Sequence, residues 1–193
     1  MLGVFLDTET NGLNPERHCI LEIAYQIVDL MTGQKIGDFH SVIQQNENEW
    51  AESDPESLEI NGFLFEDIQK GNPHEKVRME MIASFARFNI KRGNAVFICQ
   101  NPSFDRPFFS QLISPDLSET LLLPYHWLDL ASMYWSRLML STKDPISLFQ
   151  KINFSKDQIA AYFNLPAEVK PHRAMNGVEH LLLCYRSVVG FKK

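Results

Sequence analysis

The sequence has 193 residues, of which 45% are hydrophobic and 22% charged, and its formal net charge is −6 at pH 7. This length suits a single domain over residues 1–193, and the composition is that of a soluble globular protein. The acidic balance argues against a broad basic face for nucleic acid, but not against a site whose bound metal ions supply the positive charge.

The sequence also carries no sign of a membrane or secretory protein. No stretch approaches the roughly 20 apolar residues that a membrane helix needs, and no basic region precedes an apolar run at the N-terminus. The cysteines, Cys19, Cys99 and Cys184, are scattered and contain no CxxC pair. We therefore expect free thiols in a reducing compartment, no zinc site, and a cytoplasmic protein without membrane association.

Apolar and β-branched runs predict the strands. The first three are expected at 2–6, 20–30 and 35–43, and a Thr32-Gly33 turn between the last two indicates an antiparallel hairpin. Further strands are expected at 95–99 and in the short run that ends near Asp129.

Helical spacing and capping residues predict helices between and after these strands. The expected helices are 56–60, 63–68, 75–90, 103–113 with Ser103 as N-cap, one after Asp129, 155–163, and a final helix. The final helix has one apolar stripe, formed by Val178, Leu181, Leu182, Tyr185, Val188 and Val189. Early strands followed by alternating strands and helices predict an α/β fold with a mixed sheet flanked by helices.

Two carboxylates lie at the end of the first predicted strand, in Asp7-Thr8-Glu9-Thr10. Residues two apart on a strand share a face, so Asp7 and Glu9 can point together at a hard cation, which oxygen ligands suit. A lone Asp-x-Glu pair usually lies in solvent. At the end of an apolar strand, however, the pair costs stability unless something neutralises it, which makes it a candidate metal site.

A third carboxylate, Asp105, lies in the segment Asn101-Pro102-Ser103-Phe104-Asp105, which follows an apolar strand and opens a helix. It is a second candidate ligand. The competing interpretation is that Asp105 caps the free N–H groups of the first helical turn.

His172 follows Pro171 and precedes the final helix. A neutral imidazole near pH 7 suits a general base that activates water. A lone histidine in a loop is more often simply solvated, so this residue gains meaning only beside the carboxylates.

In this order and spacing the motifs resemble the DEDDh 3′–5′ exonucleases, which include proofreading subunits, RNase T and oligoribonuclease. The resemblance implies a ribonuclease H-like fold and hydrolysis of phosphodiester bonds at the 3′ end of single-stranded DNA or RNA. It leaves a polymerase or a second copy of the chain open as protein partners. The segments that carry it are 6–15, 20–24, 56–63, 101–105, 128–130 and 171–175.

For the site, the resemblance implies two Mg²⁺ or Mn²⁺ ions bound by Asp7, Glu9 and Asp105, with Asp7 bridging both. Two such ions lie about 3.5–4 Å apart and stabilise the attacking and leaving oxygens. His172 would accept the proton of the attacking water, so His172 and Glu9 are the implied catalytic residues. The implied contacts to the terminal nucleotide are Thr10, Leu13 and Phe104, with core packing as the alternative for Phe104.

The sequence departs from the family five residues after the histidine, where a fourth metal-binding aspartate is replaced by Gly177. At about 100° per residue, Glu179 lies some 200° from Gly177 on a helix, too far to reach the same ion in the family register. Asn176 is adjacent but neutral. His180 and Cys184 share the flank of Gly177 and are interpreted as packing residues.

Three interpretations of Gly177 remain open. Metal binding is weaker, with water in the vacancy; the final helix starts differently and brings Glu179 or Asn176 to the site; or catalysis is lost and a nucleic-acid or protein-binding role is kept. We expect a metal-dependent 3′–5′ exonuclease of reduced activity, with a catalytically decayed binding module as the alternative. Arg106 and Arg173 flank the proposed site, where they could contact phosphate.

Overall fold

The computed structural model describes residues 1–143 and 152–191. Its strands are β1 (Leu2–Thr10), β2 (Ile20–Asp29), β3 (Lys35–Val42), β4 (Ala95–Cys99) and β5 (Trp127–Asp129). They form a five-stranded sheet in the order β3-β2-β1-β4-β5. The pairs β1–β2 and β2–β3 are antiparallel, whereas β1–β4 and β4–β5 are parallel, so the sheet is mixed as predicted.

The antiparallel hairpin of β2 and β3 is confirmed. Its turn contains Gly33, which has a positive φ of 74° and donates its N–H to the carbonyl of Asp29. The first strand, in contrast, runs farther than predicted. Pairing with β2 continues to Thr10 opposite Ile20, so Asp7 and Glu9 lie on the strand itself and not after it.

The helices expected from the sequence are present, with shifted ends. They are α2 (Pro55–Asn61), α3 (Phe65–Gln69), α4 (His74–Arg87), α5 (Pro102–Leu112), α7 (Leu130–Ser141), α9 (Lys156–Tyr162) and α10 (Ala174–Val188). The structure adds α1 (Glu47–Ala51) and α6 (Pro115–Thr120). Both are short, are capped by Asn46 and Ser114, and bury no residue, so they leave no apolar period in the sequence.

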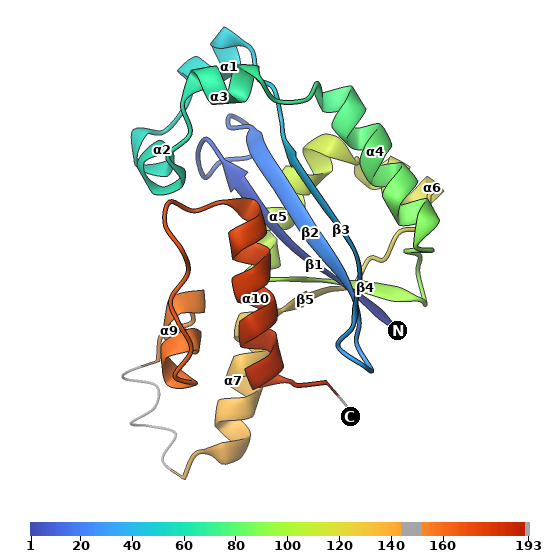
Figure 1. Ribbon diagram of the computed structural model, residues 1–193, viewed down its shortest axis with the longest axis vertical. Helices are drawn as coiled ribbons and strands as arrows, with labels where there is room; N and C mark the ends of the chain where they lie inside the picture. Colours follow the sequence, from blue (N-terminus) through green and yellow to red (C-terminus); the bar gives the residue numbers. More distant parts are fainter. Residues whose placement is uncertain (144–151, 192–193) are drawn as a thin grey trace.

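Helices cover both faces of the sheet (Figure 1). Val4 and Leu6 of β1 pack in a core with α4 and α5, whereas Phe5 packs in a second core with α7, α9 and α10. This alternation follows from the two-residue period of a strand. Asp7 and Glu9 continue the face of Phe5, so the fold directs them toward the layer that contains α9 and α10.

The cysteines of the described residues are free thiols, as predicted. Cys99 and Cys184 are buried free thiols, and Cys19 is a partly exposed one. In residues 1–143 and 152–191, none of the helices combines the length and the apolar character required to traverse a bilayer.

Candidate functional site

The end of β1 forms the floor of the candidate site. β1 pairs with β4 only as far as Phe5, which lies opposite Ile98, while its pairing with β2 continues to Thr10. The stretch from Asp7 to Thr10 therefore extends past its parallel neighbour. Ligand sites in such sheets lie at the carboxyl ends of parallel strands, because the side chains there are not covered by the next strand.

Asp105 reaches this edge from the first turns of α5. Its Oδ1 atom accepts a 2.9 Å hydrogen bond from Oγ1 of Thr8, although the two residues are 97 positions apart. The capping interpretation of Asp105 is wrong, because its carboxylate binds β1 and not its own helix. The prediction of Ser103 as N-cap is also wrong: Asn101 is the N-cap, with a left-handed φ of 59°.

Burial raises the pKa of all three carboxyl groups. Burial, followed by the charges of Asp7 and Glu22, raises the pKa of Glu9 to about 9. Burial and the charge of Asp7 raise the pKa of Asp105 well above its usual range. Burial also raises the pKa of Asp7, against the opposing effect of Lys156. Acidic groups that are buried together in this way are the usual signature of a site built to receive positive charge.

A lysine that the sequence analysis did not single out supplies positive charge to this cluster. The Nζ atom of Lys156, at the start of α9, lies 3.2 Å from Oδ1 of Asp7 and 3.1 Å from Oε2 of Glu168. Burial alone would lower the pKa of Lys156, but the charges of Asp7 and Glu168 raise it above its usual range. Lys156 is therefore a protonated cation inside the site.

Glu168 joins this ion pair from the loop between α9 and α10. Its Oε2 atom also lies 3.6 Å from Nδ1 of His180, and its Oε1 atom lies 3.8 Å from Nδ1 of His172. Burial would raise the pKa of Glu168, but His180 and Lys156 outweigh it and lower the pKa to about 2. His180, with Nε2 3.0 Å from the carbonyl of Pro166, thus belongs to a polar network and is not only a packing residue.

The final helix keeps the register that the motif implies. The backbone N–H of Ala174, its first residue, donates a 2.7 Å hydrogen bond to Oε2 of the buried Glu22 on β2. Gly177 faces the site, whereas Glu179 is exposed to solvent. The interpretation in which a different helix start brings Glu179 to the site is therefore wrong.

The Asp7–Lys156 ion pair occupies the space that a side chain at residue 177 would need. A Cβ atom at residue 177 would lie 2.0 Å from Oδ2 of Asp7 and 3.0 Å from Nζ of Lys156. The carbonyl of Gly177 lies 3.4 Å from the same Nζ atom. Any side chain at this position would compete with the ion pair for the same space.

His172 lies at the rim, beside a cavity of about 480 Å³ lined by Glu59, Ile60, Lys170, Pro171 and His172 itself. Its backbone N–H donates to the carbonyl of Ile60, which fixes the loop against α2. Its Nδ1 atom lies 3.8 Å from Oε1 of Glu168, and Glu168 and Asp7 both contact Nζ of Lys156. The structure thus brings His172 to the carboxylates, as the motif spacing predicts.

The three predicted substrate contacts differ in exposure. Leu13 is 73% exposed, as expected for a side chain that is free to contact a ligand. Thr10 is buried, and its hydroxyl donates to the carbonyl of Gly12. Phe104 is partly buried, with its ring 5.1 Å from that of Phe108, which favours the core-packing alternative for Phe104.

Arg173, one of the two arginines considered as phosphate contacts, has other partners. Arg173 donates to the carbonyl of Asn61 and stacks over the ring of Phe63 at 4.0 Å. Asn61 in turn donates to the carbonyl of Thr10. Arg173 and Asn61 therefore lock the loop before α10 onto α2 and the end of β1.

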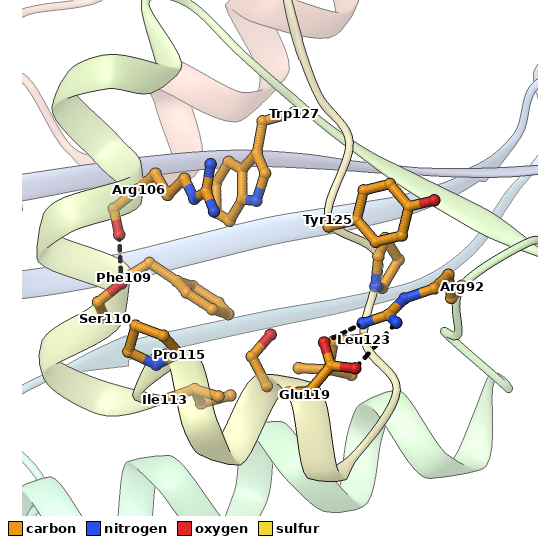
Figure 2. A pocket seen from close by; sticks show the side chains of 12 residues that line it. Arg92, Arg106, Phe109, Ser110, Ile113, Pro115, Glu119, Leu123, Tyr125 and Trp127 are labelled. Atoms are coloured by element: carbon orange, nitrogen blue, oxygen red, sulfur yellow. Dashed lines mark hydrogen bonds and ion pairs between the residues drawn. The ribbon is translucent and has the colours of Figure 1, made fainter.

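Arg106 points into a different cavity, of about 200 Å³, beside Trp127 (Figure 2). The other arginine of this cavity, Arg92, is paired with Glu119 at 2.6 Å and lies over the ring of Tyr125. None of Asp7, Glu9 or His172 lines this second cavity, so it is separate from the candidate site.

The donor set fits a two-metal site only in part. Oxygen ligands from Asp7, Glu9 and Asp105 are present, but the fourth carboxylate is missing and Asp7 is already paired with an ammonium group. Within residues 1–143 and 152–191, no three side chains of His, Cys, Asp and Glu are arranged closely enough to hold a metal ion. In the same residues, Oε1 of Glu168 is buried without a hydrogen-bond donor.

One feature of the sequence could have indicated that Lys156 is a buried cation. Lys156 stands at i−3 and i−4 from Ile159 and Ala160, both fully buried, so it lies on the apolar stripe of its helix. It also lies in the first helical turn, where the helix dipole disfavours a cation. A lysine in both positions requires buried carboxylate partners, but their identity is not readable from local sequence.

Comparison with known proteins identifies the architecture. The sequence matches the family model RNase_T, described as "Exonuclease", over residues 4–182. The structure resembles E. coli exonuclease I in complex with a dT13 oligonucleotide, with a TM-score of 0.73 and 16% identity, covering 97% of this chain and 40% of that one. It also resembles cell-death related nuclease 4, with a TM-score of 0.74 and 12% identity, covering 97% of this chain and 63% of that one.

A third similar structure is the zinc-bound form of the E. coli exonuclease I complex with single-stranded DNA. Its TM-score is 0.71 at 14% identity, over 96% of this chain and 40% of that one. No curated protein sequence matches the chain. These likenesses confirm the predicted ribonuclease H-like α/β fold, and the chain spans about 40% of the length of exonuclease I.

Proposed function

Because the chain belongs to the RNase_T exonuclease family, we propose that it is a 3′–5′ exonuclease of reduced activity that depends on Mg²⁺ or Mn²⁺. Its substrate in this proposal is the 3′ end of a single-stranded DNA or RNA. The observation that carries the proposal is the burial of Asp7, Glu9 and Asp105 within electrostatic reach of one another, with His172 3.8 Å from the neighbouring Glu168. A fold that only bound a partner would have no chemical need for this combination.

Each residue has a role in the proposed reaction that its position supports. Asp7, Glu9 and Asp105 would bind divalent cation, which when present polarises the phosphate and lowers the pKa of bound water. His172, at the rim and within reach of the cluster, would accept the proton of the attacking water. Leu13, which is exposed and follows β1 by three residues, would pack against the terminal nucleotide.

A second candidate function is favoured by the ion pair between Asp7 and Lys156. A protein in which Asp7 is already neutralised by an ammonium group could bind a 3′ end without cutting it. Gly177 also favours this alternative, because it stands where the family has a metal-binding carboxylate. In this alternative the chain is a binding module of the same fold.

A degradation assay distinguishes the two functions. Single-stranded DNA and RNA oligonucleotides labelled at the 5′ end are incubated with Mn²⁺ and the wild type, Glu9→Ala or Glu179→Ala. Glu179 is the matched control, an exposed carboxylate on α10. Binding of the same oligonucleotides is followed in parallel by fluorescence anisotropy in chelator.

The exonuclease proposal expects a slow ladder of products shortened from the 3′ end. Glu9→Ala should reduce the rate by about 100-fold or more, because it removes a group that acts on developing charge, whereas Glu179→Ala should not change it. Tight binding of the oligonucleotide without any shortening would support the binding module instead. Cleavage that survives Glu9→Ala would place the activity outside this site.

A further inference from the structure

The three acceptors around the Lys156 ammonium form a complete coordination shell. Its Nζ atom lies 3.2 Å from Oδ1 of Asp7, 3.1 Å from Oε2 of Glu168 and 3.4 Å from the carbonyl oxygen of Gly177. An ammonium group has three N–H donors and no acceptor, so these three oxygens satisfy all of its donors. The ammonium is therefore bound as an ion in its own site and not as a solvated surface charge.

Burial makes this ion pair costly to open. The side chain of Lys156 is 13% exposed, that of Asp7 is 14% exposed and that of Glu168 only 2%. Removing one member of such a buried set leaves an uncompensated charge. A divalent ion that takes Oδ1 of Asp7 must therefore first displace the ammonium.

The backbone around Lys156 restricts where the ammonium could go. Lys156 is followed on its helix by Ile159 and Ala160, which are fully buried against the second core. The neighbouring Asp157 accepts the backbone N–H of Glu168 at 2.9 Å, which ties the two partners of the ion pair together. The lysine and its second carboxylate are thus held as one unit.

Gly177 leaves room for the Lys156 ammonium. A Cβ atom there would lie 3.0 Å from Nζ of Lys156, so an aspartate side chain would enter the volume that the ammonium now fills. Because Gly177 has no side chain, the positively charged Lys156 side chain can lie in this space.

We infer that the Lys156 ammonium replaces one of the two divalent ions of a DEDDh-type site, so that the chain binds at most one such ion. Glu168 acts as the positioning residue that holds the ammonium against Asp7. This inference deepens the proposed function, and it rests on the location of the divalent-ion site given there.

Counting bound Mn²⁺ by electron paramagnetic resonance, without nucleic acid, tests the inference. The proteins are the wild type, Lys156→Met, the double variant Lys156→Met/Gly177→Asp, and Lys35→Met as a control. Lys35 is an exposed lysine paired with Asp38, so its replacement makes the same charge change away from the site. Circular dichroism verifies that each variant is folded.

We expect at most one Mn²⁺ per wild-type or Lys35→Met chain. Lys156→Met should bind Mn²⁺ at least 10-fold more tightly, and the double variant should bind two ions. A wild type that binds two ions as tightly as the double variant would overturn the inference, and so would a Lys156→Met protein that binds like the wild type.

A second measurement needs no variant. The NH₃⁺ resonance of Lys156 in ¹H–¹⁵N spectra should stay at its position when Mg²⁺ is added, because the ammonium remains bound. Its loss or a large shift at saturating Mg²⁺ would show displacement and reject the inference. Since neither readout involves cleavage, an inactive protein would leave this test intact, and a failed test would leave the degradation assay intact.

Discussion

Thr8 and Asp105 join two distant parts of the chain through a 2.9 Å hydrogen bond from the threonine hydroxyl to the carboxylate. Both side chains are buried, so the acceptor has no water to replace its donor. We expect Thr8→Val, which preserves shape, to lower the free energy of unfolding by about 1–3 kcal/mol. Urea denaturation of the metal-free protein measures this change.

Thr120→Val is the matched control for that experiment. The Thr120 hydroxyl donates to the carbonyl of Asp116 on an exposed turn of α6, where water can replace it. Its loss should change the unfolding free energy by less than about 0.5 kcal/mol. Equal effects of the two substitutions would show that Thr8 contributes nothing specific to the site.

Glu9 should make the metal-free protein less stable at high pH. Its pKa is raised to about 9 in the folded state, from an ordinary value of 4.5. Between these values the folded protein keeps a proton that the unfolded chain has lost, so stability falls as pH rises from about 4.5 to about 9. Glu9→Gln cannot ionise and should raise the melting temperature at pH 8.5 by about 2–4 °C.

Thermal melts in chelator at pH 4.5 and 8.5 test this dependence. The effect of Glu9→Gln should be much larger at the higher pH, because at pH 4.5 the folded carboxyl is protonated and the unfolded one is only about half ionised. Glu16→Gln, at an exposed position, should change neither melt. A Glu9→Gln protein that melts like the wild type at pH 8.5 would contradict the raised pKa.

Glu168 should have the opposite dependence, at acid pH. Its pKa is lowered to about 2 from an ordinary value of 4.5, so its stabilising charge is present above pH 4.5 and lost as pH falls toward 2. Glu168→Gln should cost about 3 kcal/mol at pH 7, because Lys156 loses a buried partner. Its stability should then change less than that of the wild type between pH 4.5 and 2.

Urea titrations of both proteins at several pH values measure the two profiles. Glu66→Gln, an exposed carboxylate on α3, should follow the wild-type profile. If the stability of Glu168→Gln and of the wild type fell in parallel between pH 4.5 and 2, the protonation of Glu168 would not be what destabilises the wild type in acid.

The sequence predicts those parts of the site that local chemistry determines. The two-residue period of a strand places Asp7 and Glu9 on one face, and the apolar stripe of the final helix fixes the register of Gly177 and Glu179. Both features depend on residues close in the chain, so no tertiary contact is needed to infer them. The extension of β1 to Thr10 was missed because polar residues at a strand end look like a turn.

The ion pair of Asp7 and Lys156 could not be inferred in this way. The two residues are 149 positions apart, and their contact depends on how α9 packs against α10. From position 177 alone, one expects that the loss of the carboxylate leaves one ligand position of the metal site empty. In the folded protein, the Lys156 ammonium of α9 lies in this space. The expected consequence of Gly177 therefore changes from weaker metal binding to a site that contains its own cation.

Gly177→Ala gives the most direct test of this arrangement. In a helix interior the change from Gly to Ala normally stabilises by about 1 kcal/mol. Here the new Cβ atom would lie 2.0 Å from Oδ2 of Asp7, so the carboxylate must turn away and weaken its pairing with Lys156. We expect Gly177→Ala to destabilise the protein by about 1–3 kcal/mol, because the disrupted pair is buried.

A double-mutant cycle with Asp7→Ala separates this effect from helix propensity. In the Asp7→Ala background the obstructing carboxylate is absent, so Gly177→Ala should become stabilising by about 1 kcal/mol. The coupling between the two positions should therefore reach about 2 kcal/mol or more, measured by urea denaturation of the four proteins. Independent effects at the two positions would show that Asp7 does not occupy the space beside Gly177, so that a side chain at residue 177 would not compete with the Asp7–Lys156 ion pair.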